Sequence, residues 1–416
     1  MKLLIISQYY WPENFRINDI VKLLVNEGIE VTVLTGCPNY PSGLAFEGYS
    51  NYRKITEIHS DGYFIYRVPI ILRGNSSSIR LFLNYISFIL SGIIFSNSFL
   101  KDKKYDLVFV YGLSPLFQVI IGIYIKYIKK IPLITWIQDL WPDSLRLTGR
   151  IKNRYVLNFI SLLVSWVYKK NDLLLVQSRG FFKHIKDNVG SVPIVYLPTP
   201  GEVKSNSLVD HSFYSFDYFL KDGFNLVFTG NLGSVQSLHT ILDAAEILKQ
   251  KEDIRIILIG SGSLKQWLSS EILNRNLYNI ILTGPYKPEV MPQIFSKASA
   301  LLVSLNSDPI LNLTIPAKVQ SYLAAGKPII ASLSGEGARI ILEAKAGLVC
   351  QTENPVALSE AILKLKFMNS YELEMMGALG KDYFLNNFHP NIVVDNLINI
   401  FEHTINDSHN ILLLNK

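Results

Sequence analysis

The sequence is poor in cysteine. Its 416 residues include only Cys37 and Cys350, which lie far apart. This excludes a framework of disulfides and a Cys-x-x-Cys zinc site, and it favours a reducing compartment. The chain turns polar at Ser7 and Gln8, too early for the apolar core of a secretory signal, so no such signal is predicted.

Long hydrophobic runs are also missing, although hydrophobic residues make up 49% of the chain and its mean hydropathy is +0.23. No run of 18 apolar residues occurs, and the nearest, residues 81–95, is interrupted by Asn84 and Ser87. A segment of this length is expected to be too short to span a bilayer easily.

Most motifs of nucleotide, metal and nucleophile chemistry are missing as well. There is no Walker A loop, no complete Gly-x-Gly-x-x-Gly, no Asp-x-Asp, no zinc-binding histidine pair and no Gly-x-Ser-x-Gly. Basic residues do not alternate with aromatic ones in a stripe, so no nucleic-acid partner is expected. These absences favour a mechanism without metal or cofactor, in which loops and helix ends hold the ligand.

Charge is distributed unevenly along the chain. Residues 1–200 contain 23 Lys and Arg against 13 Asp and Glu, whereas residues 201–416 contain 17 against 21. Basic residues flank the apolar segments of the first half, at Arg73, Arg80, Lys101, Lys103, Lys104, Lys126, Lys129 and Lys130. This pattern fits a protein that rests on a membrane surface with anionic lipids. Core helices with solvated charged ends would give the same pattern, and both interpretations stay open.

Short apolar runs alternate with helical periodicity along the chain. Strands are predicted over 2–7, 30–36, 106–112, 132–139, 172–178 and 193–198, and again over 225–231, 254–262, 279–284, 300–305 and 328–332. This alternation predicts an α/β fold with two doubly wound parallel sheets. The pattern restarts after a polar stretch. The predicted domains are therefore 1–200 and 223–385, joined by a linker over 201–222. A terminal helical segment, 386–416, follows and could pack back on the first domain.

Four successive strands of the second domain end in small or polar residues. They are followed by Gly230, Asn231 and Gly233, then by Ser261 and Gly262, then by Gly284 and Lys287, and finally by the segment that leads to Pro316. Lys318 and Val319 stand in the first turn of the helix that Pro316 opens. A helix start carries roughly half a positive charge and can hold an anion. The alternative is that Pro316 and Gly326 merely begin and end a helix.

Two motifs carry a resemblance to a known family. Residues 228–236 are Phe-x-Gly-Asn-Leu-Gly-x-x-Gln, and residues 316–328 are Pro-x-Lys-x-x-x-Tyr-Leu-Ala-x-Gly-Lys-Pro. With QYYWPENFRIND (8–19) and WIQDLWPDSL (136–145), they resemble retaining glycosyltransferases of family 4, which have the GT-B fold of two facing Rossmann-like domains. The resemblance covers nearly the whole chain. It extends to the bacterial subgroup that adds amino sugars, N-acetyl-L-fucosamine among them, in O-antigen or capsule synthesis.

The resemblance implies a nucleotide-sugar site in the second domain. It assigns to the donor Gly230, Asn231, Gly233, Gln236, Ser261, Gly262, Gly284, Lys287, Pro316, Lys318, Val319 and Ser321. Backbone N–H groups near Lys318 and Val319 would face the diphosphate, and the Lys318 ammonium would add a charge.

This sequence departs from the family pattern in the same region. Leu313 and Ser321 stand where many members carry two glutamates, and Asn231 and Gln236 stand where many carry an arginine and a lysine. The phosphates are therefore expected to depend on Lys318 and the glycine loops, with Lys287 and Arg16 as further candidates.

The resemblance places the acceptor in the first, membrane-facing domain. Asp139, Arg16 and Gln138 are the predicted catalytic residues, and Trp11, Glu13, Asn14 and Trp141 are predicted on the acceptor side. Helix capping by Arg16 and core packing of the tryptophans are the alternatives. Gln138 replaces a histidine that relatives place near the 6-hydroxyl of the donor sugar, which would suit a 6-deoxy sugar.

The hypothesis is a retaining, metal-independent hexosyltransferase that needs no cofactor. It would move an N-acetyl-amino-deoxyhexose of the L-fucosamine type from a UDP-sugar to a polyprenyl-diphosphate-linked sugar. It would act as a peripheral protein on an anionic membrane surface, the cytoplasmic face of the bacterial plasma membrane. A nucleotide-sugar epimerase of the same fold and a non-catalytic sugar-nucleotide-binding membrane protein are the alternatives.

Overall fold

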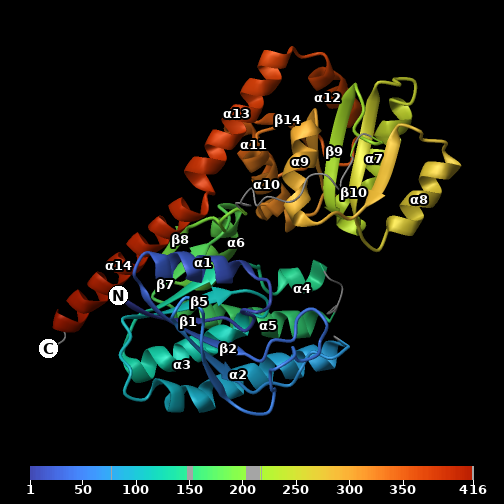
Figure 1. The fold of residues 1–416 in the computed structure, drawn as a ribbon. Coiled ribbons are helices and arrows are strands. Elements are labelled where there is room, and N and C mark those ends of the chain that lie inside the picture. The colour runs from blue at the N-terminus through green and yellow to red at the C-terminus, as the bar shows by residue number, and fades with distance from the viewer. Residues whose placement is uncertain (76, 148–152, 203–215, 217, 415–416) are drawn as a thin grey trace. The chain divides into compact units, whose positions relative to one another are not determined.

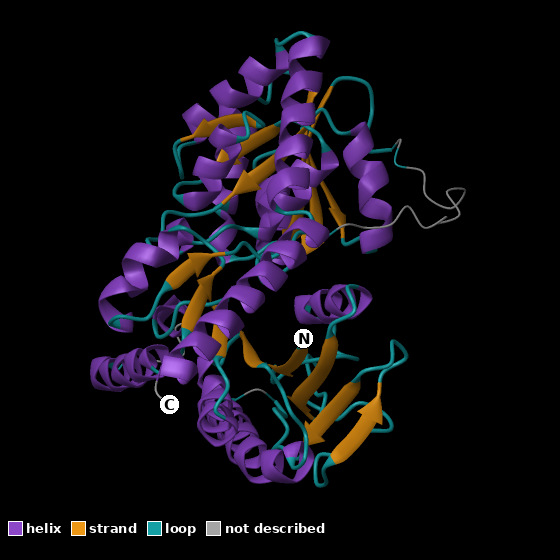
Figure 2. Cartoon of the chain, turned by 90° about the vertical axis from the view of Figure 1, so that its left-hand side faces the viewer, coloured by secondary structure: helices purple, strands orange, loops and turns teal. Residues whose placement is uncertain are grey.

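The structure is a computed structural model that describes all residues except 76, 148–152, 203–215, 217 and 415–416. Contacts divide the chain into two units, residues 1–200 with 390–416 and residues 201–389. Most of the predicted linker, 201–222, lies outside the described residues. Each unit is built on one sheet flanked by helices (Figures 1 and 2), so the predicted fold class is confirmed.

The N-terminal unit has a sheet in the order β3-β4-β2-β1-β5-β6-β7-β8, in which only the β3–β4 pair is antiparallel. Its strands are β1 (Lys2–Ile6), β2 (Glu30–Gly36), β3 (Ile55–Ile58), β4 (Phe64–Val68), β5 (Leu107–Gly112), β6 (Leu133–Ile137), β7 (Leu173–Val176) and β8 (Ile194–Tyr196). The central strands β5, β6 and β7 are buried at every position, as expected for parallel strands covered on both faces.

Helices cover this sheet. They are α1 (Arg16–Asn26), α2 (Ser78–Leu100), α3 (Val119–Lys129), α4 (Asp143–Leu147), α5 (Arg154–Lys169), α6 (Gly180–Val189) and α14 (Pro390–Leu414), with the 3₁₀ turn η1 (Leu116–Gln118). The last of them, α14, contacts α1 and places Val393, Leu397 and Phe401 in the core beneath the sheet. The end of the chain is therefore part of the N-terminal core.

The C-terminal unit has a wholly parallel sheet in the order β11-β10-β9-β12-β13-β14. Its strands are β9 (Phe224–Asn231), β10 (Ile254–Ser261), β11 (Ile280–Gly284), β12 (Ala300–Ser304), β13 (Ile329–Ser332) and β14 (Gly347–Cys350). Its helices are α7 (Leu238–Ile247), α8 (Lys265–Asn274), α9 (Met291–Lys297), α10 (Ala317–Ala325), α11 (Glu336–Glu343), α12 (Pro355–Lys366) and α13 (Ser370–Asn387), and its 3₁₀ turns are η3 (Ser234–Gln236), η4 (Pro288–Val290) and η5 (Leu311–Leu313).

Three strands were absent from the sequence-based expectation: β3, β4 and β14. The pair β3–β4 was missed because β4 carries Arg67, and a charged residue normally indicates solvent. In the structure Arg67 is buried. Its guanidinium is bonded to the Glu57 carboxylate on β3 and to the backbone carbonyls of Trp11 and Gly36. These partners compensate the buried charge.

Helix α2 corrects the expected length of the apolar segment. It extends over 23 residues. By length and composition alone it could cross a membrane, because an 18-residue stretch of it has a mean hydropathy of 1.7 and is only 28% buried. Asn84 and Ser87, which had suggested an interruption, do not break the helix. Asn84 is buried, accepts a hydrogen bond from Gln8 Nε2 and donates one to the Ile71 carbonyl.

A core substitution in α14 tests its place in the N-terminal unit. The Phe401 ring packs edge-on against Phe109, with 5.1 Å between the centroids. We expect Phe401→Ala to lower the free energy of unfolding of this unit by about 3–5 kcal/mol, because it leaves a cavity. Denaturation followed by tryptophan fluorescence measures the loss. Ile392→Ala, at a half-exposed position of the same helix, should change little, and an equal loss in both variants would contradict the assignment.

Candidate functional site

The first part of the candidate site is a pair of glycine loops at the ends of β9 and β10. The two strands remain in register to their last residues, with Gly260 opposite Gly230 and Ser261 opposite Asn231. A Cβ atom on Gly260 would lie 1.8 Å from the Gly230 carbonyl oxygen, so only glycine fits there. The loops are held together by the Leu232 N–H, which donates to the Ser261 carbonyl at 2.9 Å.

Lys318 reaches this place from the first turn of α10. Its Nζ lies 3.7 Å from the centroid of the Phe228 ring, and a Cβ atom on Gly230 would be 2.8 Å from its Cε. The Nζ atom is buried and has no hydrogen-bond partner among the described residues. Burial lowers the pKa of this ammonium to about 7. A cation without a counterion beside two glycine loops is suited to an anionic ligand.

The start of α10 differs from the expectation in one respect. The Val319 N–H donates to the Pro316 carbonyl at 2.9 Å, so it is already used within the helix start, and its contact with a phosphate stays a prediction. The N–H groups of Ala317 and Lys318 have no backbone acceptor among the described residues. They remain the donors that this helix start can offer to an anion.

The other predicted donor residues fall into three groups. Gln236 is buried and its Oε1 accepts from the Gly233 N–H at 3.1 Å, so it shapes the first loop and its oxygen does not face a ligand. Asn231 and Lys287 are exposed at the ends of β9 and β11. Gly262 is confined by the Leu232 carbonyl, and Gly284 has a positive φ of 82°.

Ser321 follows Lys318 by three residues on α10. It lines a pocket of about 480 Å³ between α9, α10 and α13, together with Thr229 and Phe295. Neither Gly230 nor Lys318 is among the residues that line this pocket. Ser321 therefore faces this pocket, and its role in donor binding stays a prediction.

On the N-terminal unit, Glu13 has a structural role in place of the predicted acceptor-side role. Its carboxylate is buried and accepts three backbone N–H groups, from Tyr10 at 3.1 Å, Asn39 at 2.8 Å and Tyr40 at 2.7 Å. Burial raises the pKa of this carboxyl, although the three hydrogen bonds act in the opposite direction. Glu13 ties the loop after β1 to the loop after β2.

The neighbours of Glu13 are better placed for a ligand. Trp11 is 40% exposed and lies edge-on to the His59 ring, Asn14 is exposed, and Arg16 opens α1.

Asp139 follows β6 and is held by a residue that the sequence did not point to. Its Oδ2 accepts from the backbone N–H of Ser114 at 3.2 Å and from the Ser114 hydroxyl at 2.9 Å. The same hydroxyl accepts from Trp141 Nε1 at 2.7 Å. Asp139 is half-buried, so its carboxylate is both fixed in direction and accessible. Ser114 stands at the end of β5, and the rule that ligands lie at strand ends could have found it.

Gln138 is buried beside Asp139. Its Oε1 accepts from the Thr199 hydroxyl at 2.7 Å, and its backbone carbonyl accepts from Gln177 Nε2. Its own Nε2 is buried without a hydrogen-bond partner in the part of the chain that the structure describes. A buried amide donor left unpaired in this way is costly unless a ligand completes it.

Comparisons with known proteins agree with these features. Residues 223–366 match the family described as "Glycosyl transferases group 1". The chain is 22% identical to the putative colanic acid biosynthesis glycosyl transferase WcaI of Escherichia coli K12 over 78% of its length and 82% of that protein. It is 24% identical to the probable glycosyltransferase WbjE of Pseudomonas aeruginosa over 69% and 73% of the two chains. The chain is a glycosyltransferase.

Among solved structures, that of HepE from Anabaena in complex with UDP is similar with a TM-score of 0.67, at 10% identity, over 97% of this chain and all of that one. This likeness concerns the fold, which is GT-B. In this glycosyltransferase the segment that matches the family contains both glycine loops and Lys318, the groups suited to hold an anion.

The depressed pKa of Lys318 predicts a proton-linked ligand. Below pH 7 the buried ammonium is charged and costs stability, and between its folded pKa of about 7 and its unfolded pKa of about 10.4 this cost is relieved as the pH rises. A diphosphate beside the ammonium favours the charged form. We therefore expect UDP, the expected donor nucleotide, to bind at pH 8 with uptake of close to one proton and to bind more weakly as the pH rises further.

Calorimetry in buffers of different ionisation enthalpy measures this uptake. Lys318→Met should lose the uptake and bind UDP about tenfold more weakly or worse, since a charge-assisted contact is removed. Lys287→Met, at an exposed position, should keep the uptake. Equal proton numbers and affinities in wild type and Lys318→Met would remove Lys318 from the site.

Proposed function

We propose that this glycosyltransferase moves an N-acetyl-amino-deoxyhexose from a UDP-sugar to a sugar carried on a lipid diphosphate, in the synthesis of a bacterial surface polysaccharide. The observation that carries the donor half is the Lys318 ammonium, buried beside two glycine loops without a counterion. A diphosphate would supply the missing charge. Solved structures of the same fold hold UDP, UDP with glucose and UDP-glucose, which supports a UDP-linked donor.

The acceptor half rests on different support. The name of WcaI assigns that relative to colanic acid biosynthesis. In this chain the oriented Asp139 carboxylate is suited to accept a hydrogen bond from a sugar hydroxyl and to receive its proton as the hydroxyl attacks. Retention of configuration is proposed from the resemblance of the motifs.

The departure of the diphosphate needs stabilisation of negative charge. Lys318 and the two free N–H groups at the start of α10 can provide it, which is the role that a metal ion has in other transferases. The proposal therefore includes metal independence, and turnover should be unchanged in the presence of EDTA.

The identity of the donor sugar is proposed from Gln138. Its Oε1 is taken by Thr199, so the group available to a ligand is the unpaired Nε2. An amide fixed in this way cannot titrate or reorient as a histidine can, and it is compatible with a sugar that lacks the 6-hydroxyl. This favours a 6-deoxy sugar such as N-acetylfucosamine.

A transfer assay tests the proposal. Turnover of UDP-N-acetylfucosamine with a short-chain prenyl-diphosphate-linked N-acetylhexosamine should exceed that of UDP-N-acetylglucosamine. Asp139→Asn should lower turnover by about 10²-fold or more while UDP binding is kept, because the change removes a positioned proton acceptor.

Lys186→Gln, at an exposed position on α6, is the control and should be fully active. Near wild-type turnover in Asp139→Asn would exclude the aspartate from catalysis. Conversion of the sugar nucleotide without an acceptor would favour an epimerase, and UDP binding without turnover would favour a non-catalytic binding protein.

The proposed site of action is the cytoplasmic face of the plasma membrane, and α2 supports it. The outer side of this helix is apolar. Exposed apolar residues recur along it at Ile79, Phe82, Leu83, Ile86, Leu90 and Ile94. Its buried side carries Leu81, Phe88, Ile89, Phe99 and Leu100 together with the polar Asn84 and Ser96. A surface helix of a soluble protein normally turns polar residues outward, so the apolar outer side of α2 is suited to a lipid environment.

Helix α5 has a second apolar stripe. It exposes Tyr155, Phe159, Leu162, Leu163 and Trp166. Both α2 and α5 contact η1, so the two stripes belong to neighbouring helices of the N-terminal unit. Arg80, Lys101 and Lys104 are exposed at the ends of α2 and can meet anionic lipid. Lys103 is less available, because its ammonium lies over the rings of Phe64 and Tyr66.

Vesicle sedimentation tests this surface. Phe159→Glu with Leu162→Glu should reduce binding to phosphatidylethanolamine–phosphatidylglycerol vesicles by at least about tenfold, because two apolar side chains can no longer enter the lipid. Leu273→Glu with Phe367→Glu, at equally exposed apolar positions of the C-terminal unit, is the matched control and should bind as wild type. Equal losses in both double variants would refute a specific membrane face.

A further inference from the structure

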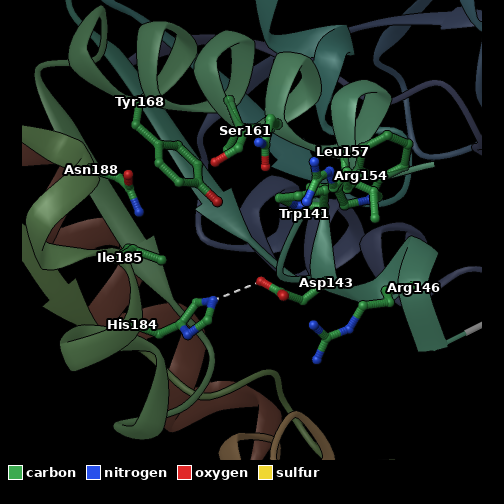
Figure 3. Close-up of a pocket in the computed structure, with 13 residues that line it drawn as sticks. Trp141, Asp143, Arg146, Arg154, Leu157, Ser161, Tyr168, His184, Ile185 and Asn188 are labelled. Carbon is green, nitrogen blue, oxygen red and sulfur yellow. Dashed lines mark hydrogen bonds and ion pairs between the residues drawn. The ribbon is translucent and has the colours of Figure 1, made fainter. Parts of the chain in front are cut away.

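The N-terminal unit contains a pocket whose lining includes one predicted site residue, Trp141. It has a volume of about 410 Å³ and lies between α4, α5 and α6. Figure 3 shows side chains from all three helices pointing into it, with Trp141, Asp143 and Arg146 on one side and His184 opposite. The volume is in the range of small-ligand sites. Trp141 lines the pocket and also donates to the Ser114 hydroxyl that holds Asp139, so the pocket borders the Asp139 site.

Helix α5 has two distinct faces at this point. One face lines the pocket with Arg154, Asn158, Ser161 and Tyr168, which recur at intervals of four, three and seven residues. The other carries the exposed apolar stripe that includes Phe159, Leu162 and Trp166. The same helix therefore borders a polar cavity on one side and the proposed lipid surface on the other. A ligand with a polar head and an apolar tail matches this arrangement.

Tyr168 indicates that the pocket is incomplete without a ligand. Its side chain is almost fully buried, yet its hydroxyl has no hydrogen-bond partner among the described residues. Figure 3 shows this hydroxyl pointing into the pocket, toward Ser161 and Asp143. Burial, together with the Asp143 carboxylate, raises the pKa of Tyr168, so the hydroxyl keeps its proton and can donate. A buried hydroxyl left unpaired is unfavourable, and a ligand oxygen would satisfy it.

Charged groups surround the same cavity. His184 Nε2 lies 2.8 Å from Asp143 Oδ2, a contact that fixes both side chains at the pocket wall. Arg146 has no ion-pair partner among the described residues, and Arg154 stacks on the Tyr155 ring without a carboxylate partner there. Two arginines free of carboxylates favour a phosphate or diphosphate. The hydroxyl, carboxylate and amide groups behind them favour a polyhydroxylated ring.

We propose that this pocket binds the glycosyl diphosphate head of the lipid-linked acceptor, with Arg146 and Arg154 on the phosphates and Tyr168 with the Asp143–His184 pair on sugar hydroxyls. The lipid chain then leaves along the apolar stripe of α5 into the membrane. The assignment deepens the proposed function and rests on it for the identity of the acceptor. Phosphate chemistry is shared by acceptor and phospholipid head groups, and the sugar-binding groups behind the arginines favour the acceptor.

Calorimetric titration with a citronellyl-diphosphate-linked N-acetylglucosamine tests the pocket without requiring turnover. Tyr168→Phe removes only the unpaired hydroxyl, so the fold should be kept and the affinity should fall about three- to tenfold. Arg146→Gln with Arg154→Gln should lower the affinity at least about tenfold. UDP affinity, measured in parallel, should be unchanged in both variants, because the donor residues belong to the other unit.

Two matched controls sharpen the test. Lys183→Gln removes a charge from the exposed side of α6, and Tyr127→Phe removes a hydroxyl from an exposed tyrosine on α3; both should bind the probe as wild type. Unchanged affinity in Tyr168→Phe and in the double arginine variant would overturn the proposal. So would equal sensitivity of these variants to phosphatidylglycerol nanodiscs or inorganic phosphate, which would identify a general anion site.

The pocket and the proposed function fail in different ways. If wild type binds UDP and transfers sugar, and the pocket variants lose neither probe affinity nor the KM for the acceptor, only the pocket assignment is wrong. If wild type binds the probe through Tyr168 and the arginines but transfers no sugar, the pocket stands and the proposed function is wrong.

Discussion

The burial of one ammonium group shapes the candidate donor site. A pKa of about 7 for Lys318 corresponds to roughly 4–5 kcal/mol against the charged form. The chain accommodates this group by placing its Nζ against the face of Phe228, where the ring offers a favourable electrostatic surface, and by keeping Gly230 free of a side chain. The charged form of this ammonium is unfavourable without an anion beside it. Under the proposed function, binding of a donor diphosphate would offset this cost.

The N-terminal unit is subject to a different constraint. It has to remain folded although α2 and α5 expose apolar side chains. It does this with α2, a helix that is apolar on its outer face as well as on much of its buried face. Asn84 is directed inward and bonded to Gln8 and to a backbone carbonyl, so it costs little when buried. Gly92 lets the helix approach Ile121 closely, since a Cβ atom there would meet that side chain at 2.4 Å. The inner face of α2 thus combines apolar packing with specific polar contacts, while its outer face exposes apolar side chains.

The sequence predicted the two parallel sheets because their central strands are continuous apolar runs, which hardly depend on tertiary context. It missed β3 and β4 because Arg67 is neutralised by partners that are distant in sequence, Glu57 and the carbonyls of Trp11 and Gly36. In the donor site Lys318 was identified from a motif. The motif could not show that the Lys318 ammonium has no counterion among the described residues, because this depends on three-dimensional packing. The structural roles of Glu13 and Gln236 were missed for a related reason, since a polar residue in a loop gives no sign of whether its oxygens face a ligand or backbone N–H groups.

The pocket between α4, α5 and α6 could not be predicted from the sequence either. Arg154, Ser161 and Tyr168 lie on one face of a helix whose apolar stripe dominates its sequence pattern, so that pattern did not single them out. Only the fold brings His184 of α6 and Asp143 of α4 to that face, at 2.8 Å from each other. With its polar face at the pocket and its apolar face at the proposed membrane, α5 would set the depth at which an amphiphilic acceptor sits. The sugar would then be held at a fixed height above the lipid, and the position of the enzyme on the membrane would itself select acceptors by the distance between their diphosphate and their terminal sugar.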